Sequence, residues 1–259
     1  PVVGRHIFPF KHSKSIFHER GLLVSNGLKY PLTEFPNPKI IIVGLPKSGN
    51  TWVQNLVSLS LEMPIIHILR DTDKSGVGMT HSPFSRKIYG RKDFARGLYL
   101  IRDVRDIICS YYHYSQTEDY RKNVDANCNF SNIRDFYHQY FLGKLIDRYD
   151  WLNHAEQYTS HGLPLVRYED LIDSPEEQLN SAFRRMNLDV SEEKVRNAVE
   201  QSALNKMSKA SLTTHREVPK SHFRKGGYGN YRSELPEDVL NNINSRFKDY
   251  LMRWGYKID

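Results

Sequence analysis

The chain has 259 residues, which is enough for one large α/β domain with a full core or for two small domains. Charged residues make up 26% and hydrophobic residues 39%, an ordinary balance for a globular protein, and the aromatic content of 12% is enough to line a substrate cleft. The formal net charge of +7 favours an anionic ligand but does not choose between nucleotide, nucleic acid and membrane.

Several classes are excluded by what the sequence lacks. No apolar run reaches 18 residues and no signal-peptide pattern opens the chain, so we expect no membrane span and a cytoplasmic location. The first residue is Pro1 rather than Met, so a luminal domain trimmed of an N-terminal anchor stays open. Cys109 and Cys128 form no CxxC pair, so neither a disulfide framework nor a metal site is expected. No run of like charge is typical of a nucleic-acid-binding arm, so we expect no nucleic-acid partner.

The first part of the chain leads into a buried strand. Residues 1–37 are irregular and carry several prolines and glycines, so we expect a lead-in that borders an acceptor pocket. The apolar, β-branched run Lys39–Val43 predicts a strand buried on both faces. Gly44 and Pro46 end that strand, and apolar groups at three- and four-residue spacing predict a helix from Asn50.

A strand, a glycine loop and a helix together predict an anion site. Backbone N–H groups at a helix N-terminus point outward, and the helix dipole is positive there. Gly44, Gly49 and Thr51 fit the Walker A pattern. Asn50 stands where that pattern has its lysine, and the lysine is instead Lys47, inside the loop. A lysine placed there suits an anion whose reactive group lies close to the first phosphate.

The loop from Pro46 to Trp52 reads Pro-Lys-Ser-Gly-Asn-Thr-Trp. It resembles the 5′-phosphosulfate loop of the sulfotransferases that use PAPS (3′-phosphoadenosine 5′-phosphosulfate). The resemblance implies that Lys47 stabilises the leaving phosphate and that Trp52 stacks on the adenine. The loop residues that it assigns to nucleotide binding are Lys47, Ser48, Gly49, Asn50, Thr51 and Trp52.

A histidine follows the next predicted strand. Residues 76–83 read as a short strand that ends in a proline turn, and His81 lies at its carboxyl end, where open α/β sheets bind ligands. The segment resembles the Lys-Thr-His-x-Pro segment of the same family, whose histidine is the catalytic base. His81 matches that base, but Met79 stands in place of the family's lysine.

A third motif follows a second buried strand over residues 98–101. Asp103 can cap a helix that begins at Val104. Arg102 and Ser110 then bracket the first two turns of that helix and can converge on one ligand at its start. The stretch resembles the family's Arg-(x)7-Ser-x-Tyr motif, which implies that Arg102 and Ser110 bind the 3′-phosphate of PAPS. Arginine suits this task because its planar fork bonds phosphate oxygens in pairs.

The next part of the chain alternates helix and strand signals. Apolar spacing predicts a core helix over 133–154, a third strand within 162–171, and amphipathic helices over 175–186 and 191–202. The string Arg-Tyr-Glu-Asp-Leu resembles a family segment whose tyrosine contacts the adenine side of the nucleotide. By that resemblance Tyr168 contacts the adenine, although a strand-end tyrosine in the core is an equal alternative.

The last motif is basic and rich in glycine. Leu204 stands where the family has a phenylalanine that stacks on adenine, and it can still pack against the base. Arg224, Lys225 and Gly226 open a segment that resembles the family's Arg-Lys-Gly-x-x-Gly-Asp-Trp phosphate clamp. A terminal helix is predicted over 236–254. The family's dimerisation pattern is absent from this region, so a monomer or a weak dimer is expected.

These signals predict one α/β domain over residues 1–259, with a central parallel β-sheet flanked by helices and a P-loop-like phosphosulfate loop. The resemblance spans residues 39–255. It implies a PAPS-dependent sulfotransferase that moves a sulfuryl group to a hydroxyl or amine of a small-molecule acceptor, with PAPS as co-substrate and no metal. One alternative is a P-loop nucleotide kinase or NTPase, which needs a lysine in place of Asn50 and a carboxylate for magnesium. Another is a non-catalytic module that binds an anionic polymer through the +7 charge.

Overall fold

The computed structural model describes residues 37–71, 73–85, 94–202 and 227–258. Four strands form one sheet in the order β2-β1-β3-β4, and every pairing in it is parallel. The strands are β1 (Lys39–Val43), β2 (Gly76–Thr80), β3 (Phe94–Ile101) and β4 (Leu165–Arg167). The predicted parallel sheet flanked by helices is confirmed.

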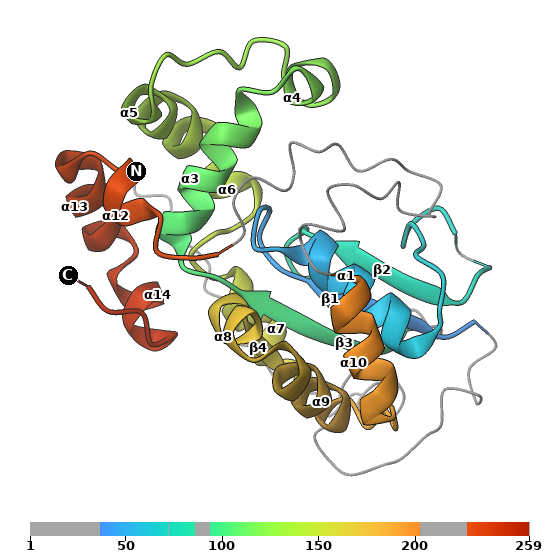
Figure 1. Ribbon diagram of the computed structural model, residues 1–259. Helices are drawn as coiled ribbons and strands as arrows, with labels where there is room; N and C mark the ends of the chain where they lie inside the picture. The colour runs from blue at the N-terminus through green and yellow to red at the C-terminus, as the bar shows by residue number, and fades with distance from the viewer. Residues whose placement is uncertain (1–36, 72, 86–93, 203–226, 259) are drawn as a thin grey trace, which may run out of the picture.

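Helices cover both faces of the sheet, and Figure 1 shows α1, α9 and α10 together on one side and α3 with α12 on the other. The first face carries α1 (Asn50–Leu61), α8 (Tyr168–Asp173), α9 (Pro175–Arg185) and α10 (Glu192–Gln201). The second carries α3 (Val104–Ser115), α4 (Glu118–Asn123), α5 (Ile133–Asp135), the π-helix η3 (Phe136–Leu145), α6 (Ile146–Arg148), α7 (His154–Thr159), α12 (Tyr231–Glu234), α13 (Glu237–Arg246) and α14 (Lys248–Arg253).

The central strand β1 explains why helices are needed on both faces. Ile41 and Val43 pack into the core under α3, whereas Ile40 and Ile42 pack into the core under α1. All four side chains are fully buried. Successive side chains of a strand point to opposite faces, so this unbroken apolar run is stable only between two helical layers.

The strand order creates a switch point between β1 and β3. The chain leaves β1 through α1 on one face and leaves β3 through α3 on the other. Open α/β sheets bind ligands where adjacent strands send their connections to opposite faces. The loop 44–49 and the residues after Ile101 therefore lie next to each other at the carboxyl edge of the sheet.

Two predicted helices differ from the structure. The expected helix over 133–154 is π-helical through η3 and has ended before residue 150. Phe136 and Phe141, and likewise Tyr140 and Leu145, are five residues apart and all buried. A π-helix brings residues at that spacing onto one face, which explains the wider turn. The predicted terminal helix is divided into α13 and α14 at Phe247, a buried residue with non-helical backbone angles.

Truncation of a core side chain on α3 should cost far more stability than the same truncation at the surface. Ile107 is fully buried in the core under α3, so we expect Ile107→Ala to lower the free energy of unfolding by about 2–5 kcal/mol. Leu152 is 47% exposed, so Leu152→Ala should change it by less than about 0.5 kcal/mol. Urea unfolding measures both, and equal losses would contradict the burial assigned to α3.

Candidate active site

The loop after β1 has a backbone that only certain residues accept. Lys47 and Gly49 are both left-handed, with φ of 70° and 101°. A Cβ at Gly49 would lie 2.7 Å from the ring of Tyr168, so glycine is required there for space as well as for conformation. Gly49 leads directly into α1, and no side chain caps that helix. The first-turn N–H groups of α1 thus form a site suited to an anion.

Lys47 is a partly buried cation at this loop. Its Nζ lies 4.3 Å from the centroid of the Tyr114 ring. Burial, and then the charge of Arg102, lower the pKa of Lys47 to about 8. A non-glycine residue held in the left-handed region costs conformational energy, which is typical of functional loops. A negatively charged ligand beside Lys47 would oppose both causes of the lowered pKa.

Arg102, the first residue after β3, joins this loop to the C-terminal part of the chain. Its Nη1 donates to the Lys47 carbonyl at 3.0 Å, and its Nη2 donates to the Gly227 carbonyl at 3.1 Å. The guanidinium lies 4.3 Å from the centroid of the Tyr168 ring. The Arg102 Nε is buried and has no hydrogen-bond partner among the described residues. Two predicted phosphate-binding cations, Lys47 and Arg102, are therefore brought together.

The predicted adenine-side aromatic residues lie beside them. Trp52 and Tyr168 meet edge to face, with ring centroids 6.0 Å apart. The Trp52 indole N–H donates to the Ser202 carbonyl at 3.0 Å. Both rings are largely buried, with 7% and 5% of the residue exposed. The structure thus places Trp52, Tyr168, Gly49 and Arg102 in one cluster.

His81 reaches the same loop from the end of β2. Its Nδ1 lies 2.8 Å from the Gly44 carbonyl oxygen, which can only accept, so Nδ1 carries the hydrogen and Nε2 carries a lone pair. Burial lowers the pKa of His81, the bond to Gly44 partly offsets this, and the charge of Lys47 lowers it further. The imidazole is therefore neutral at neutral pH, as a general base must be.

Asn50 occupies the position of the Walker A lysine and supports the loop from within. Its Nδ2 donates to the Leu45 carbonyl at 2.9 Å and lies 3.4 Å from the Gly44 carbonyl. The side chain is buried, at 3% exposure. Asn50 therefore holds the carbonyl that also binds His81, rather than extending toward a distant phosphate.

The remaining predicted residues in the described ranges are less closely tied to this cluster. Ser48 is buried in the loop, and its N–H donates to the Leu45 carbonyl at 3.2 Å. Thr51 is partly buried in the first turn of α1. Ser110 is partly buried on α3, and no hydrogen bond within the described ranges joins it to Arg102. The predicted residues Leu204, Arg224, Lys225 and Gly226 lie outside the described residues.

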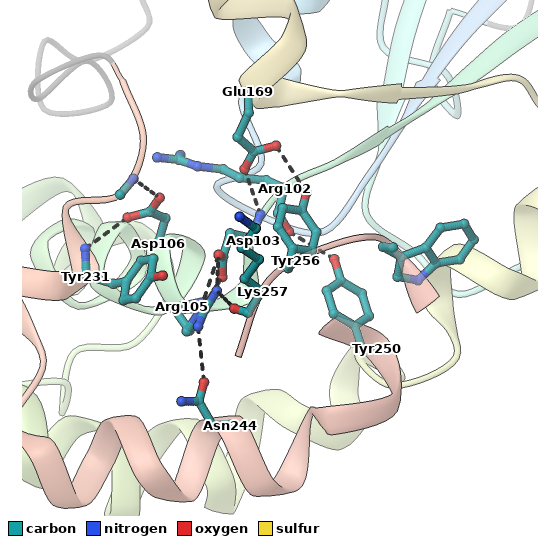
Figure 2. A network of polar contacts seen from close by, with 12 residues as sticks. Arg102, Asp103, Arg105, Asp106, Glu169, Tyr231, Asn244, Tyr250, Tyr256 and Lys257 are labelled. Atoms are coloured by element: carbon teal, nitrogen blue, oxygen red, sulfur yellow. Dashed lines mark hydrogen bonds and ion pairs between the residues drawn. The ribbon is translucent and has the colours of Figure 1, made fainter. Parts of the chain in front are cut away.

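Asp103 begins α3 as predicted and anchors a buried ion pair, which Figure 2 shows from close by. Its Oδ1 accepts from the Arg105 N–H at 2.9 Å, which confirms it as the helix cap. Its Oδ2 lies 2.7 Å from the Arg105 Nη2, and both side chains are almost fully buried. Arg105 also donates to the Asn244 side chain at 3.2 Å and to the Lys257 carbonyl at 2.8 Å. This pair ties the start of α3 to the C-terminus.

Two residues that the sequence did not single out hold the main chain at Arg102. Glu169 accepts from the Asp103 N–H at 2.9 Å and from the Tyr256 hydroxyl at 3.1 Å, and burial raises the pKa of its carboxyl. The Tyr250 hydroxyl donates to the Arg102 carbonyl at 3.0 Å. Because these partners are far apart in sequence, no local pattern could have identified them.

Asp106, in the first turn of α3, binds the second half of the predicted glycine clamp (Figure 2). Its two carboxylate oxygens accept from the Gly229 N–H at 2.5 Å and from the Tyr231 N–H at 3.1 Å. The side chain is almost fully buried, and burial raises the pKa of its carboxyl. Asp106 and Arg102 therefore fix residues 227–231 against α3 from two points.

The described residues contain neither a metal-ligand cluster nor a membrane-spanning helix. No group of three or more His, Cys, Asp and Glu side chains in these ranges is placed to hold a metal ion. None of the helices in the same ranges is long and apolar enough to cross a bilayer.

Comparisons with known proteins agree on one family. Residues 79–255 match the sulfotransferase domain family. The chain is 21% identical over 235 residues to sulfotransferase 1A1 of Bos taurus, covering 75% of this chain and 77% of that protein. Its structure is similar to mouse sulfotransferase SULT7A1 complexed with PAP, with a TM-score of 0.65, 15% identity, and coverage of 85% and 86%. It is also similar to retinol dehydratase in complex with androsterone and PAP, with a TM-score of 0.63, 15% identity, and coverage of 85% and 83%.

Breaking the buried ion pair at the start of α3 should be costly. Arg105→Met leaves the Asp103 carboxylate buried without its partner, so we expect a loss of about 3–5 kcal/mol in the free energy of unfolding. Arg134 pairs with Asp238 at 2.7 Å, but both side chains are more than half exposed. Arg134→Met should therefore cost less than about 1 kcal/mol. Chemical denaturation measures both, and a small loss at Arg105 would show that this pair does not hold the start of α3.

Proposed function

The chain belongs to the sulfotransferase domain family, so its reaction is sulfuryl transfer from PAPS, and we propose which of its residues carry that transfer. The observation that supports the proposal is the contact between Arg102 and Lys47, a 3.0 Å hydrogen bond at the switch point of the sheet. His81 reaches the same loop through Gly44. The proposed base His81 and the cations Lys47 and Arg102 follow three different strands and lie at the carboxyl edge of the sheet.

The two cations and the N-terminus of α1 bind different parts of the nucleotide. Lys47 and the first-turn N–H groups of α1 bind the 5′-phosphosulfate, because both present positive charge at the end of β1. Arg102, with Ser110 and the segment 224–226, binds the 3′-phosphate. The buried Nε of Arg102, which has no partner in the part of the chain that the structure describes, supports this assignment, since a buried donor without a partner is costly unless a ligand satisfies it. Trp52 and Tyr168, with Leu204, pack against the adenine.

His81 and Lys47 act on opposite sides of the transferring group. His81 Nε2 takes the proton from the acceptor hydroxyl or amine as that atom forms its bond to sulfur. Lys47 donates to the phosphate oxygen as the bond between sulfur and that oxygen breaks. The leaving group is adenosine 3′,5′-bisphosphate, and the proton remains on His81 until solvent removes it. Charge stabilisation thus lies where negative charge develops.

The acceptor is a small molecule with a hydroxyl group. A structural relative was solved with androsterone bound, and androsterone carries a hydroxyl on an apolar body. The partly exposed ring of Tyr114 lies against the Lys47 Nζ and packs edge to face on the buried rings of Tyr111 and Tyr120, so Tyr114 offers an apolar surface for such a body. We infer an acceptor of this class from that surface.

The position of Asn50 argues against a nucleotide kinase or NTPase. Such enzymes need a lysine there that reaches the β- and γ-phosphates. Asn50 instead donates to the Leu45 carbonyl at 2.9 Å and is buried. The site is accordingly built for a nucleotide whose reactive group is close to its first phosphate.

Removing the base should abolish transfer without removing the nucleotide site. We expect His81→Ala to lower kcat at least about a hundredfold, because the variant lacks the group that takes the proton in the proposed mechanism. Its Kd for adenosine 3′,5′-bisphosphate, measured by thermal-shift titration, should stay within about twofold. His138, an exposed histidine on η3, provides the control His138→Ala, which should keep wild-type kcat. Normal turnover by His81→Ala would remove the base assignment.

The alkaline side of the pH–rate profile should report Lys47. Because the pKa of Lys47 in the free protein is about 8, kcat/KM for PAPS, which reports the free protein, should fall as the pH rises through that value. Lys47→Arg keeps its charge across this range, so its kcat/KM, although lower overall, should show no fall near pH 8. If kcat/KM of Lys47→Arg still fell near pH 8, the fall would have to come from the titration of another group.

A further inference from the structure

His154, the first residue of α7, is a fully buried histidine that the predicted mechanism does not include. Its Nε2 lies 3.0 Å from the Ser82 carbonyl and 3.2 Å from the His81 carbonyl. Carbonyl oxygens only accept, so Nε2 must carry the hydrogen. Its Nδ1 is then the acceptor of the Tyr99 hydroxyl at 2.8 Å. Both ring nitrogens are thus satisfied in one tautomer.

The ring is held neutral in this arrangement. Burial lowers the pKa of His154 to about 4, so the imidazole carries no charge at neutral pH. The Tyr99 hydroxyl comes from β3, in the core under α3, where the ring of Tyr99 also lies against Tyr158. His154 is consequently fixed by the sheet on one side and presents a single donor on the other.

That donor points at the main chain of the base. Among the described residues, the segment 81–84 leaves β2 and forms four hydrogen bonds with α7, two of them from the His154 Nε2. The other two come from the Tyr158 hydroxyl, which donates to the Ser82 carbonyl at 2.7 Å, and from the Gln157 side chain, which accepts from the Phe84 N–H at 3.1 Å. Among the hydrogen bonds of the described residues, the bond from His154 is the one that reaches the His81 carbonyl itself.

These contacts constrain the orientation of the His81 ring from two ends. At the ring, Nδ1 is held by the Gly44 carbonyl at 2.8 Å. At the backbone, the His81 and Ser82 carbonyls are held by His154. If His154 were lost, the Ser82 carbonyl would keep the Tyr158 hydroxyl, whereas the His81 carbonyl would lose its donor. A displaced backbone would carry Nε2 away from the acceptor while leaving the loop 44–49 in place.

We propose that His154 is a positioning residue for the base, and that the Tyr99–His154 pair fixes the backbone of His81 so that its Nε2 meets the acceptor hydroxyl. The inference rests on the proposed function of His81. It predicts a loss in the transfer step and not in nucleotide binding, because His154 contacts neither Lys47 nor Arg102 through any hydrogen bond of the described residues.

Two substitutions of His154 distinguish the effect of losing its hydrogen bond from the effect of losing the imidazole ring. His154→Leu puts an apolar side chain of similar size in place of the imidazole and removes the Nε2–H donor. We expect kcat to fall about 10- to 100-fold, as for a small displacement of a reacting group. His154→Gln places an amide N–H close to the position of Nε2 and should recover most of that loss. In both variants the Kd for adenosine 3′,5′-bisphosphate should remain within about twofold. Thr159→Ala, on the same helix, should keep wild-type kcat.

A double-mutant cycle tests whether the effect passes through the base. In a His81→Ala background, His154→Leu should lower the residual kcat no further, because the group that it positions is gone. An equal loss with and without His81 would overturn the proposal, as would equal losses in the leucine and glutamine variants or an unchanged kcat in both.

A second readout does not depend on turnover. The hydrogen on His81 Nδ1 is bound to the Gly44 carbonyl, so it should give a slowly exchanging imidazole proton signal in wild type. That signal should be lost in His154→Leu and kept in His154→Gln. If the wild-type protein transferred no sulfuryl group, the proposed function would be wrong. The proton signal would still test whether His154 positions His81. A signal unchanged in His154→Leu would contradict the positioning itself.

Discussion

Two positive charges held close together in a partly buried setting are the constraint on which this site depends. The Arg102 guanidinium binds the carbonyl of Lys47, and its charge helps to lower the pKa of the Lys47 ammonium. Each cation lies against an aromatic ring, Lys47 on Tyr114 and Arg102 on Tyr168. A ring stabilises a cation without cancelling its charge, so both remain able to bind an anion. Under the proposed assignment, a ligand with two separate phosphate groups would relieve the repulsion between Lys47 and Arg102.

Within the described ranges, the acidic residues near this site form their hydrogen bonds and ion pair with groups other than the Lys47 and Arg102 side chains, although the charge of Arg102 acts on the Asp106 carboxyl. Asp103 pairs with Arg105, Glu169 accepts from the Asp103 N–H, and Asp106 accepts from two N–H groups after Gly227. They hold the chain on both sides of Arg102 (Figure 2), while the Arg102 guanidinium binds main-chain carbonyls and lies against the Tyr168 ring. The anionic ligand that we propose would therefore meet the positive charges of Lys47 and Arg102.

The sequence predicted the parts of the site that local patterns encode. The apolar run of β1, the displaced Lys47 and the cap at Asp103 each depend on neighbours within a few residues, and all three lie in the structure where they were expected. The bonds of His154 and Glu169 described above join residues at least 55 positions apart, so no spacing rule could have shown them.

Other differences have physical reasons of their own. The π-helical turn of η3 follows from aromatic residues five apart that must share one buried face, a pattern that a search for ordinary helical spacing reads as an α-helix. Ser110 was expected to converge with Arg102 on one ligand, which stays a prediction, since no hydrogen bond within the described ranges joins the two residues directly. Family membership and the parallel sheet were predictable because several motifs occur in order, although each alone is weak.

The central claim is that Lys47 and Arg102 form a cationic pair that binds a doubly phosphorylated adenosine. The most direct test is an NMR titration of the Lys47 side-chain amine in the free protein and in the complex with adenosine 3′,5′-bisphosphate. We expect a Lys47 pKa of about 8 in the free protein and a clear rise of that pKa when adenosine 3′,5′-bisphosphate binds, since an adjacent phosphate favours the ammonium. A pKa near the ordinary lysine value in the free protein, or one unmoved by the nucleotide, would contradict it.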